Sequence, residues 1–189
     1  MYSESCAYVD ESMRLEEGLY VLAAVAVPVD RAAEYRAVLR GLLLTKQPRL
    51  HWRDEDRKRR LATARAVAAL SPTLNIVIGA GLLPAKQRPA RRKCLERLLW
   101  QLASNDLRHV VMERRNAAGD KEDLDLVNAL RARQALPHDM HVQWGDPLAE
   151  ELLWLPDVVA GIVARAEAGD DSLWRLLRGE RMTERVICE

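Results

Sequence analysis

Two apolar runs separated by a short polar segment open the chain, and two carboxylates close the first of them. The runs are Ala7–Glu11 and Leu19–Val27, and the segment between them ends at Gly18. Both runs are rich in Val, Tyr and Ala, which favours two strands joined as a hairpin. The second run is apolar throughout, which indicates burial on both faces of a sheet. Asp10 and Glu11 therefore lie at a strand exit, where carboxylates can hold a divalent cation.

The remainder of the chain alternates helical and extended patterns. Helices are expected over residues 30–44, 54–70, 91–104, 124–136 and 148–167, and further strands over Leu74–Ala80, His109–Glu113 and His141–Trp144. This order predicts an α/β fold, with a mixed central sheet and helices on both faces. The first three strands should pair antiparallel, and the last two should extend the sheet beside the first. No linker or repeat interrupts the pattern, so residues 1–189 are expected to form a single domain, with a short helix or charged tail over 170–189.

Composition limits the classes of partner. Apolar residues make up 49% and charged residues 30% of the chain, which is typical of a globular protein. The net charge is only +1, so any affinity for nucleic acid must come from local basic patches. The three cysteines, Cys6, Cys94 and Cys188, are too widely spaced for a disulfide framework or a zinc site, which favours a reducing cytoplasm. The longest apolar run is far shorter than the roughly 20 residues of a membrane span, so no membrane partner is expected.

Acidic residues stand at the ends of several expected elements. Asp10 and Glu11 close the first strand, Glu113 and Asp146 close two later strands, and Asp157 follows a proline near the start of the last long helix. In an open α/β sheet, functional side chains gather at strand ends. Carboxylates that converge there could bind one or two hard cations and support phosphodiester cleavage. The same residues are also common as solvated turn formers, and the spacing alone leaves both interpretations open.

Four short motifs occur in an informative order. They are Tyr8–Ser12 with its Asp-Glu-Ser ending, the segment His51–Asp54, the acidic strand end Glu113–Arg115, and the helix Leu155–Gly161 with an internal Asp. Together they resemble the uncharacterised bacterial and phage family catalogued as domain of unknown function thirty-eight hundred. The resemblance extends from Tyr8 to about Arg165 and implies an RNase H-like fold.

The resemblance also implies a set of site residues. Asp10, Glu113 and Asp157 would be the ligands of Mg²⁺ or Mn²⁺ and the centre of catalysis. Glu11 and Ser12 would sit beside them in supporting roles. The chain departs from the family pattern next to the last ligand, where Pro156 and Trp154 replace the usual Ala and Gln, and after Ser12, where Met13 replaces Gly.

Further residues are candidates by type and position. His51 could carry a proton or bind the metal, because its pKa lies near neutrality, or it could be purely structural. Trp52 sits in an expected loop and could stack on a base. Arg114 and Arg115 adjoin Glu113, and one of them is expected to contact phosphate, although such residues often form only a solvated face.

The leading hypothesis is a divalent-metal-dependent nuclease or phosphodiester-processing hydrolase that acts on DNA or RNA. The alternative is a catalytically eroded RNase H-like module that binds nucleic acid or a protein partner, with its site altered around Pro156. A third hypothesis, a small enzyme acting on a nucleotide, is weaker because no complete phosphate-binding glycine loop is present. The sequence leaves the oligomeric state open.

Overall fold

A six-stranded sheet forms the centre of the computed structural model, which describes residues 4–81, 83–177 and 181–188. The strand order is β5-β4-β1-β2-β3-β6. The strands are β1 (Ser5–Arg14), β2 (Leu19–Pro28), β3 (Thr73–Ala80), β4 (His109–Glu113), β5 (His141–Gly145) and β6 (Arg181–Ile187). β2 is antiparallel to β1 and to β3, whereas β4 is parallel to β1 and β5 is parallel to β4. The expected pairing of the first five strands is therefore confirmed.

The first hairpin is longer than the apolar pattern indicated. β1 continues through its polar end to Arg14, which pairs with Leu19, because every residue of this half finds a partner in β2. The turn is a short 3-10 helix, η1 (Leu15–Glu17), and it ends at Gly18 in the left-handed conformation that glycine adopts without a steric penalty. Asp10 therefore lies within a paired strand, not at its exit.

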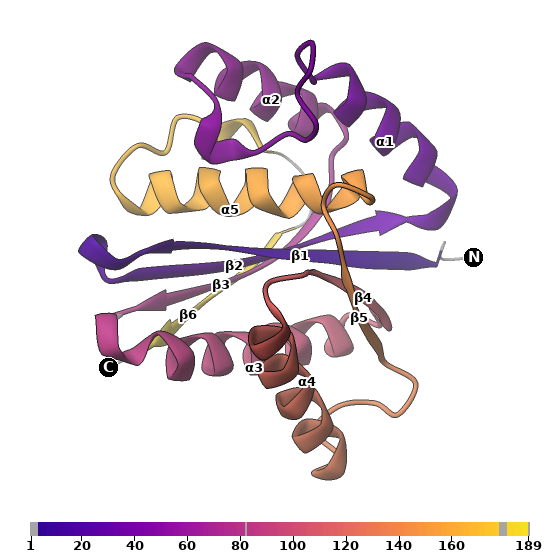
Figure 1. Ribbon diagram of the computed structural model, residues 1–189, viewed down its shortest axis with the longest axis vertical. Helices are drawn as coiled ribbons and strands as arrows, with labels where there is room; N and C mark the ends of the chain where they lie inside the picture. The colour runs from indigo at the N-terminus through magenta and orange to yellow at the C-terminus, as the bar shows by residue number, and fades with distance from the viewer. Residues whose placement is uncertain (1–3, 82, 178–180, 189) are drawn as a thin grey trace.

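In the described part of the chain, five α-helices cover the two faces of the sheet (Figure 1). They are α1 (Ala32–Gly41), α2 (Arg57–Ala69), α3 (Gln87–Ser104), α4 (Ala117–Ala132) and α5 (Trp154–Glu167). α5 packs directly on β1 and β2, and α1 and α2 lie on the same side, with α2 above α5. α3 and α4 cover the opposite face. Within the described ranges, no helix is both long enough and apolar enough to cross a bilayer.

Each face of the sheet carries its own apolar core. Alternate residues of β2 divide between them: Val21, Ala23 and Val25 face α5, whereas Tyr20 and Leu22 face α3. Because side chains alternate across a strand, a strand buried on both faces must be apolar at nearly every position. β2 is buried from Leu19 to Val27, as the sequence predicted.

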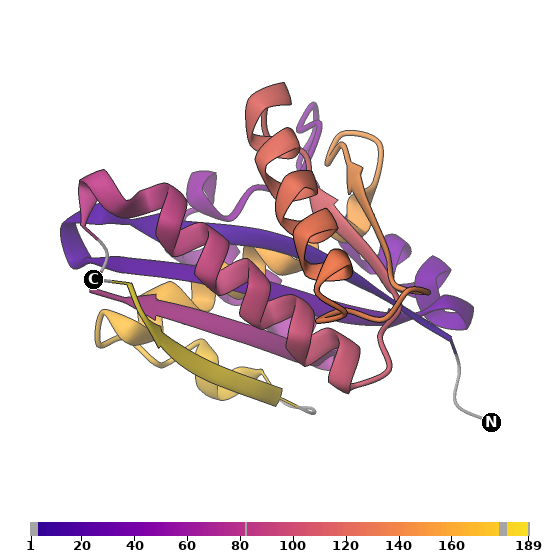
Figure 2. The same ribbon diagram turned by 90° about the horizontal axis from the view of Figure 1, so that it is seen from below.

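The C-terminal region corrects one expectation. Residues 170–189 were predicted to form a short helix and a charged tail. A short 3-10 helix is present at Trp174–Leu176, but Arg181–Ile187 is a strand, β6, that pairs in parallel with β3. β6 forms the edge of the sheet (Figure 2). An edge strand keeps one side in solvent and tolerates charged side chains, so its sequence lacks the apolar signal of an inner strand.

Candidate active site

Asp10 and Glu113 lie side by side on neighbouring parallel strands. Val9 of β1 pairs with Met112 of β4, and the two carboxylates are the residues that follow. Two residues before them, Tyr8 and Val111 both belong to the core beneath α5. Since side chains repeat every second residue along a strand, Asp10 and Glu113 project from that same face.

Asp157 reaches this face from the first turn of α5. Its Oδ2 accepts a hydrogen bond of 2.7 Å from the backbone N–H of Trp52, and Nδ1 of His51 lies 3.1 Å from the same oxygen. The segment that contains His51 and Trp52 therefore holds this carboxylate in place. Pro156 lies within the first turn, where backbone N–H groups have no partner inside the helix, so the proline is compatible with the helix at this position.

The pKa values of Asp10 and Glu113 reflect both their burial and the charges of the neighbouring carboxylates. Burial raises the pKa of Asp10 well above its usual range, and the charges of Glu113 and Asp157 raise it further. Burial also raises the pKa of Glu113, where Arg49 opposes the shift and Asp157 adds to it. Like charges shift one another in this way only when they are close. The expectation that at least one of these residues has a raised pKa is confirmed.

The donor set fits a hard cation by type, because it offers carboxylate oxygens from three elements on one face. Among the described residues, however, no three His, Cys, Asp or Glu side chains already stand in a metal-binding arrangement. Burial is the largest cause of the raised pKa values of Asp10 and Glu113, and the charges of neighbouring carboxylates add to it. A divalent cation would relieve this repulsion and favour closer approach of the oxygens.

Arg49 is a residue that the sequence did not single out. Its guanidinium Nη1 lies 3.4 Å from Oε1 of Glu113, and both side chains are half-buried. It precedes His51 by two residues, in the segment next to Pro48 where the helical sequence pattern is interrupted. Nothing in such a segment indicates that its side chain reaches β4, so the contact was visible only in three dimensions.

Glu11 corrects a prediction, because its carboxylate is engaged on the face of β1 opposite to Asp10, although the residue also borders the cavity beside Asp157. Consecutive residues of a strand point to opposite faces, and Glu11 faces α3. Its carboxylate accepts a hydrogen bond from the Tyr20 hydroxyl and pairs with Arg91. Arg91 in turn donates two hydrogen bonds, of 2.7 and 3.0 Å, to the buried carboxylate of Asp123. Glu11 therefore belongs to a buried ion network on the other side of the sheet.

His51 contacts Asp157 directly, and Ser12 borders the same space. Together with Asp157 they line a cavity of about 620 Å³. The hydrogen bond with Asp157 raises the pKa of His51 above its usual value, although burial opposes the shift.

Trp52 also borders this cavity, but its indole is only 5% exposed and belongs to the apolar core. A Cβ atom on Gly161 would lie 1.9 Å from the indole, so the ring occupies the space that this glycine leaves. Trp52 is thus a packing residue, which corrects the expectation of a loop aromatic free to stack on a base.

The two arginines after Glu113 differ in their surroundings. The Arg115 guanidinium donates to the Gly119 carbonyl at 2.7 Å and to Asp123 at 3.1 Å, so it joins the buried network. Arg114 is exposed, with Nε at 3.7 Å from Asp120. Contact of Arg114 with phosphate stays a prediction, and for Arg115 it would require a second role beside its structural one.

Comparison with known proteins adds evidence on the fold. No protein family profile and no curated protein sequence matches the chain. Among solved structures, the chain is similar to one described as the complex of PCNA and RNase HII from Archaeoglobus fulgidus, with a TM-score of 0.54 and 15% identity. The match covers 87% of this chain and 75% of the other. At this identity the likeness shows the fold alone: the chain has an RNase H-like α/β fold, as its sequence predicted.

Proposed function

We propose that the protein is a divalent-metal-dependent nuclease or a related phosphodiester-processing hydrolase, with Asp10, Glu113 and Asp157 as the ligands of Mg²⁺ or Mn²⁺. The observation that carries the proposal is the position of Asp10 and Glu113 side by side on β1 and β4, with Asp157 of α5 near enough for its charge to raise the pKa of both. The RNase H-like fold of the neighbouring structure supports it. From the order of the sequence motifs, we also propose that the chain is related to the family catalogued as domain of unknown function thirty-eight hundred, and from its cysteine usage that it works in a reducing cytoplasm.

The residues around the ligands divide the remaining tasks. When bound, divalent cations would activate a water molecule and stabilise the leaving oxygen. Trp52 holds Asp157 through its backbone N–H, which fixes the carboxylate before any cation arrives. The hydrogen bond with Asp157 raises the pKa of His51 and so favours its protonated form, and we assign His51 the role of a general acid. Arg49 offsets the charge of Glu113.

The alternative is an eroded RNase H-like module that binds nucleic acid or a protein without cleaving it. One observation favours it: no three potential ligands in the described part of the chain already stand in a metal-binding arrangement. The two proposals differ in what happens when the cation is added. A catalytic site gathers its carboxylates around the ion, whereas an eroded site leaves them apart.

Calorimetric titration with Mn²⁺ separates the two. The wild-type protein should bind Mn²⁺, and Asp10→Asn should abolish binding and cleavage of DNA or RNA oligonucleotides. Asp146→Asn is the matched control, because Asp146 also follows a strand but accepts a hydrogen bond from the Leu148 N–H in its own turn. It should bind Mn²⁺ as the wild type does. Wild-type protein that neither binds Mn²⁺ nor cleaves would favour the eroded module.

A further inference from the structure

The cavity beside Asp157 extends along α5, and neither Asp10 nor Glu113 lines it. Asp157, Gly161 and Arg165 all line it, and their spacing of four residues places them on one side of the helix. At 1.5 Å per residue, these eight positions correspond to roughly 12 Å of helix. α5 is therefore the floor of a groove that begins at the candidate metal ligands.

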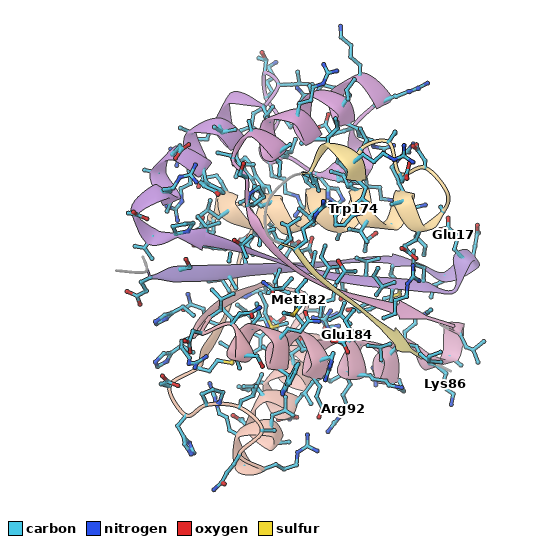
Figure 3. The ribbon with its side chains drawn as sticks, turned by 180° about the vertical axis from the view of Figure 1, so that it is seen from behind. Glu17, Lys86, Arg92, Trp174, Met182 and Glu184 are labelled. Carbon is cyan, nitrogen blue, oxygen red and sulfur yellow. The ribbon has the colours of Figure 1, made fainter. Side chains whose placement is uncertain are left out.

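The two walls of this groove differ in chemistry. One wall is the segment from η3 (Trp52–Asp54) to the start of α2, and it contributes Arg53 and Arg60. The other is the tip of the β1–β2 hairpin, which contributes the exposed side chain of Leu15 and two carboxylates, Glu16 and Glu17. Figure 3 shows Glu17 at this tip. One wall is thus cationic, and the other is apolar and acidic.

The cationic wall carries charge that no carboxylate neutralises. Within the described ranges, the exposed Arg53 side chain has no ion-pair partner. Arg60 donates to the backbone carbonyls of Trp52 at 3.2 Å and Arg53 at 3.0 Å, and its guanidinium lies 5.5 Å from the centre of the Trp52 ring; within the described residues it pairs with no carboxylate. By contrast, the groove residues Arg14 and Arg165 pair with Glu17 and Asp170.

The other basic clusters lie on the α3 side of the sheet or are paired with carboxylates. Arg91 and Arg115 belong to the buried network on the α3 side of the sheet, and Arg88 pairs with Glu122 at 3.3 Å. Figure 3 places Arg92 and Lys86 on that same far side. The α3 cluster therefore cannot guide a strand into the face that holds Asp10.

We propose that this groove binds a single strand of nucleic acid, with its phosphates along Arg53 and Arg60 and its bases toward Leu15. The groove opens at Asp157, so a strand bound in this way would lead its backbone into the candidate metal site. The inference rests on the proposed function for what happens there, but not for the binding itself.

Charge asymmetry selects a single strand over a duplex. A duplex presents a phosphate backbone on each side, and the second backbone would face Glu16, where like charges repel, because Arg14 already pairs with Glu17. A single strand presents its phosphates on one edge and its bases on the other. That arrangement matches a groove with one cationic wall and one wall that offers an apolar side chain.

Fluorescence anisotropy tests the inference. The probes are labelled oligothymidylate and oligouridylate of about 12 nucleotides, a length within the range that single-strand-binding domains cover. EDTA is present throughout, so the readout does not depend on a metal or on cleavage. Arg53→Gln should weaken binding by about threefold to tenfold and reduce the salt-dependence slope by roughly 0.7, the loss of one phosphate contact. Arg53→Lys should retain most of the affinity.

Arg92→Gln is the matched control, because it removes the same charge from an exposed site on the opposite face. It should leave affinity within about twofold of the wild type. Two results would overturn the inference: equal effects of the Arg53 and Arg92 substitutions, or a duplex of the same length that competes as well as the single strand. Loss of Mn²⁺ binding or of cleavage would instead count against the proposed function and would leave this binding result standing.

Discussion

Trp52 and Asp157 are joined by a backbone hydrogen bond of 2.7 Å, and the Trp52 indole covers Gly161 one turn further along α5. The glycine therefore determines where the tryptophan lies, and the tryptophan backbone determines where the carboxylate lies. This chain of contacts links the packing of the core to the geometry of the candidate site.

Gly161→Ala should disturb both the packing of the core and the geometry of the candidate site. The added Cβ would lie 1.9 Å from the indole, so the ring must move, and overpacking of this kind costs about 1–3 kcal/mol of unfolding free energy. Displacement of Trp52 should also weaken Mn²⁺ binding. Urea denaturation and calorimetry measure the two effects.

Gly41→Ala supplies the control. Gly41 ends α1, and a Cβ there would meet nothing within 4 Å. Its stability should match or slightly exceed that of the wild type. An equal loss of stability in both variants would mean that the indole contact is not the cause.

Asp10→Asn should stabilise the metal-free protein. The native pKa of Asp10 lies above that of the unfolded chain, so the folded state binds more protons between the two values and stability falls as pH rises through this window. The amide carries no charge and should raise unfolding free energy at neutral pH by about 1–2 kcal/mol, the scale of like-charge repulsion in a partly buried site. Denaturation in EDTA at several pH values measures this.

Adding Mn²⁺ should make the wild-type protein more stable than Asp10→Asn. The cation binds only the folded wild-type site and stabilises it by mass action, whereas Asp10→Asn gains little. An Asp10→Asn protein that is less stable than the wild type in EDTA would argue against crowded carboxylates.

His51 should titrate above its usual value in the metal-free protein. Its hydrogen bond with Asp157 raises the pKa, so the stabilising contact is complete below the unfolded value of about 6.5 and is lost as pH rises through the folded value. Asp157→Asn should move the pKa of His51 back toward its usual value. Imidazole resonances in an NMR titration follow the change, and an unaltered titration curve would mean that another group sets the shift.

Much of the fold could be predicted because its signals are local. The continuous apolar run of β2 and the carboxylate positions of Asp10 and Glu113 on adjacent strands follow from pattern and order. β6 was not predicted, because an edge strand rich in charged residues has the same sequence pattern as a solvated tail. The burial of Trp52 depends on Gly161, more than a hundred positions away, and no local signal connects the two.

The two faces of β1 explain the remaining error in the site. Strand alternation alone separates Asp10 from Glu11, yet the motif that contains both residues suggests a joint role. In the structure one carboxylate faces α5 and the other faces Arg91 and α3. Adjacent positions in a motif can therefore lie in unrelated surroundings on the two faces of a sheet.

Glu11→Gln should accordingly reduce stability and spare the metal site. Glu11 pairs with Arg91, whose side chain is 9% exposed, and loss of one partner of a buried pair costs about 1–3 kcal/mol. Glu17→Gln, which breaks the exposed contact with Arg14, should change stability by less than about 0.5 kcal/mol. Because Glu11 faces away from Asp157, Mn²⁺ affinity in Glu11→Gln should stay near the wild-type value, whereas Asp10→Asn loses it. Denaturation measures the stability of each variant, and calorimetry measures its Mn²⁺ affinity. A Glu11→Gln protein of normal stability that no longer binds Mn²⁺ would mean that Glu11 is a metal ligand.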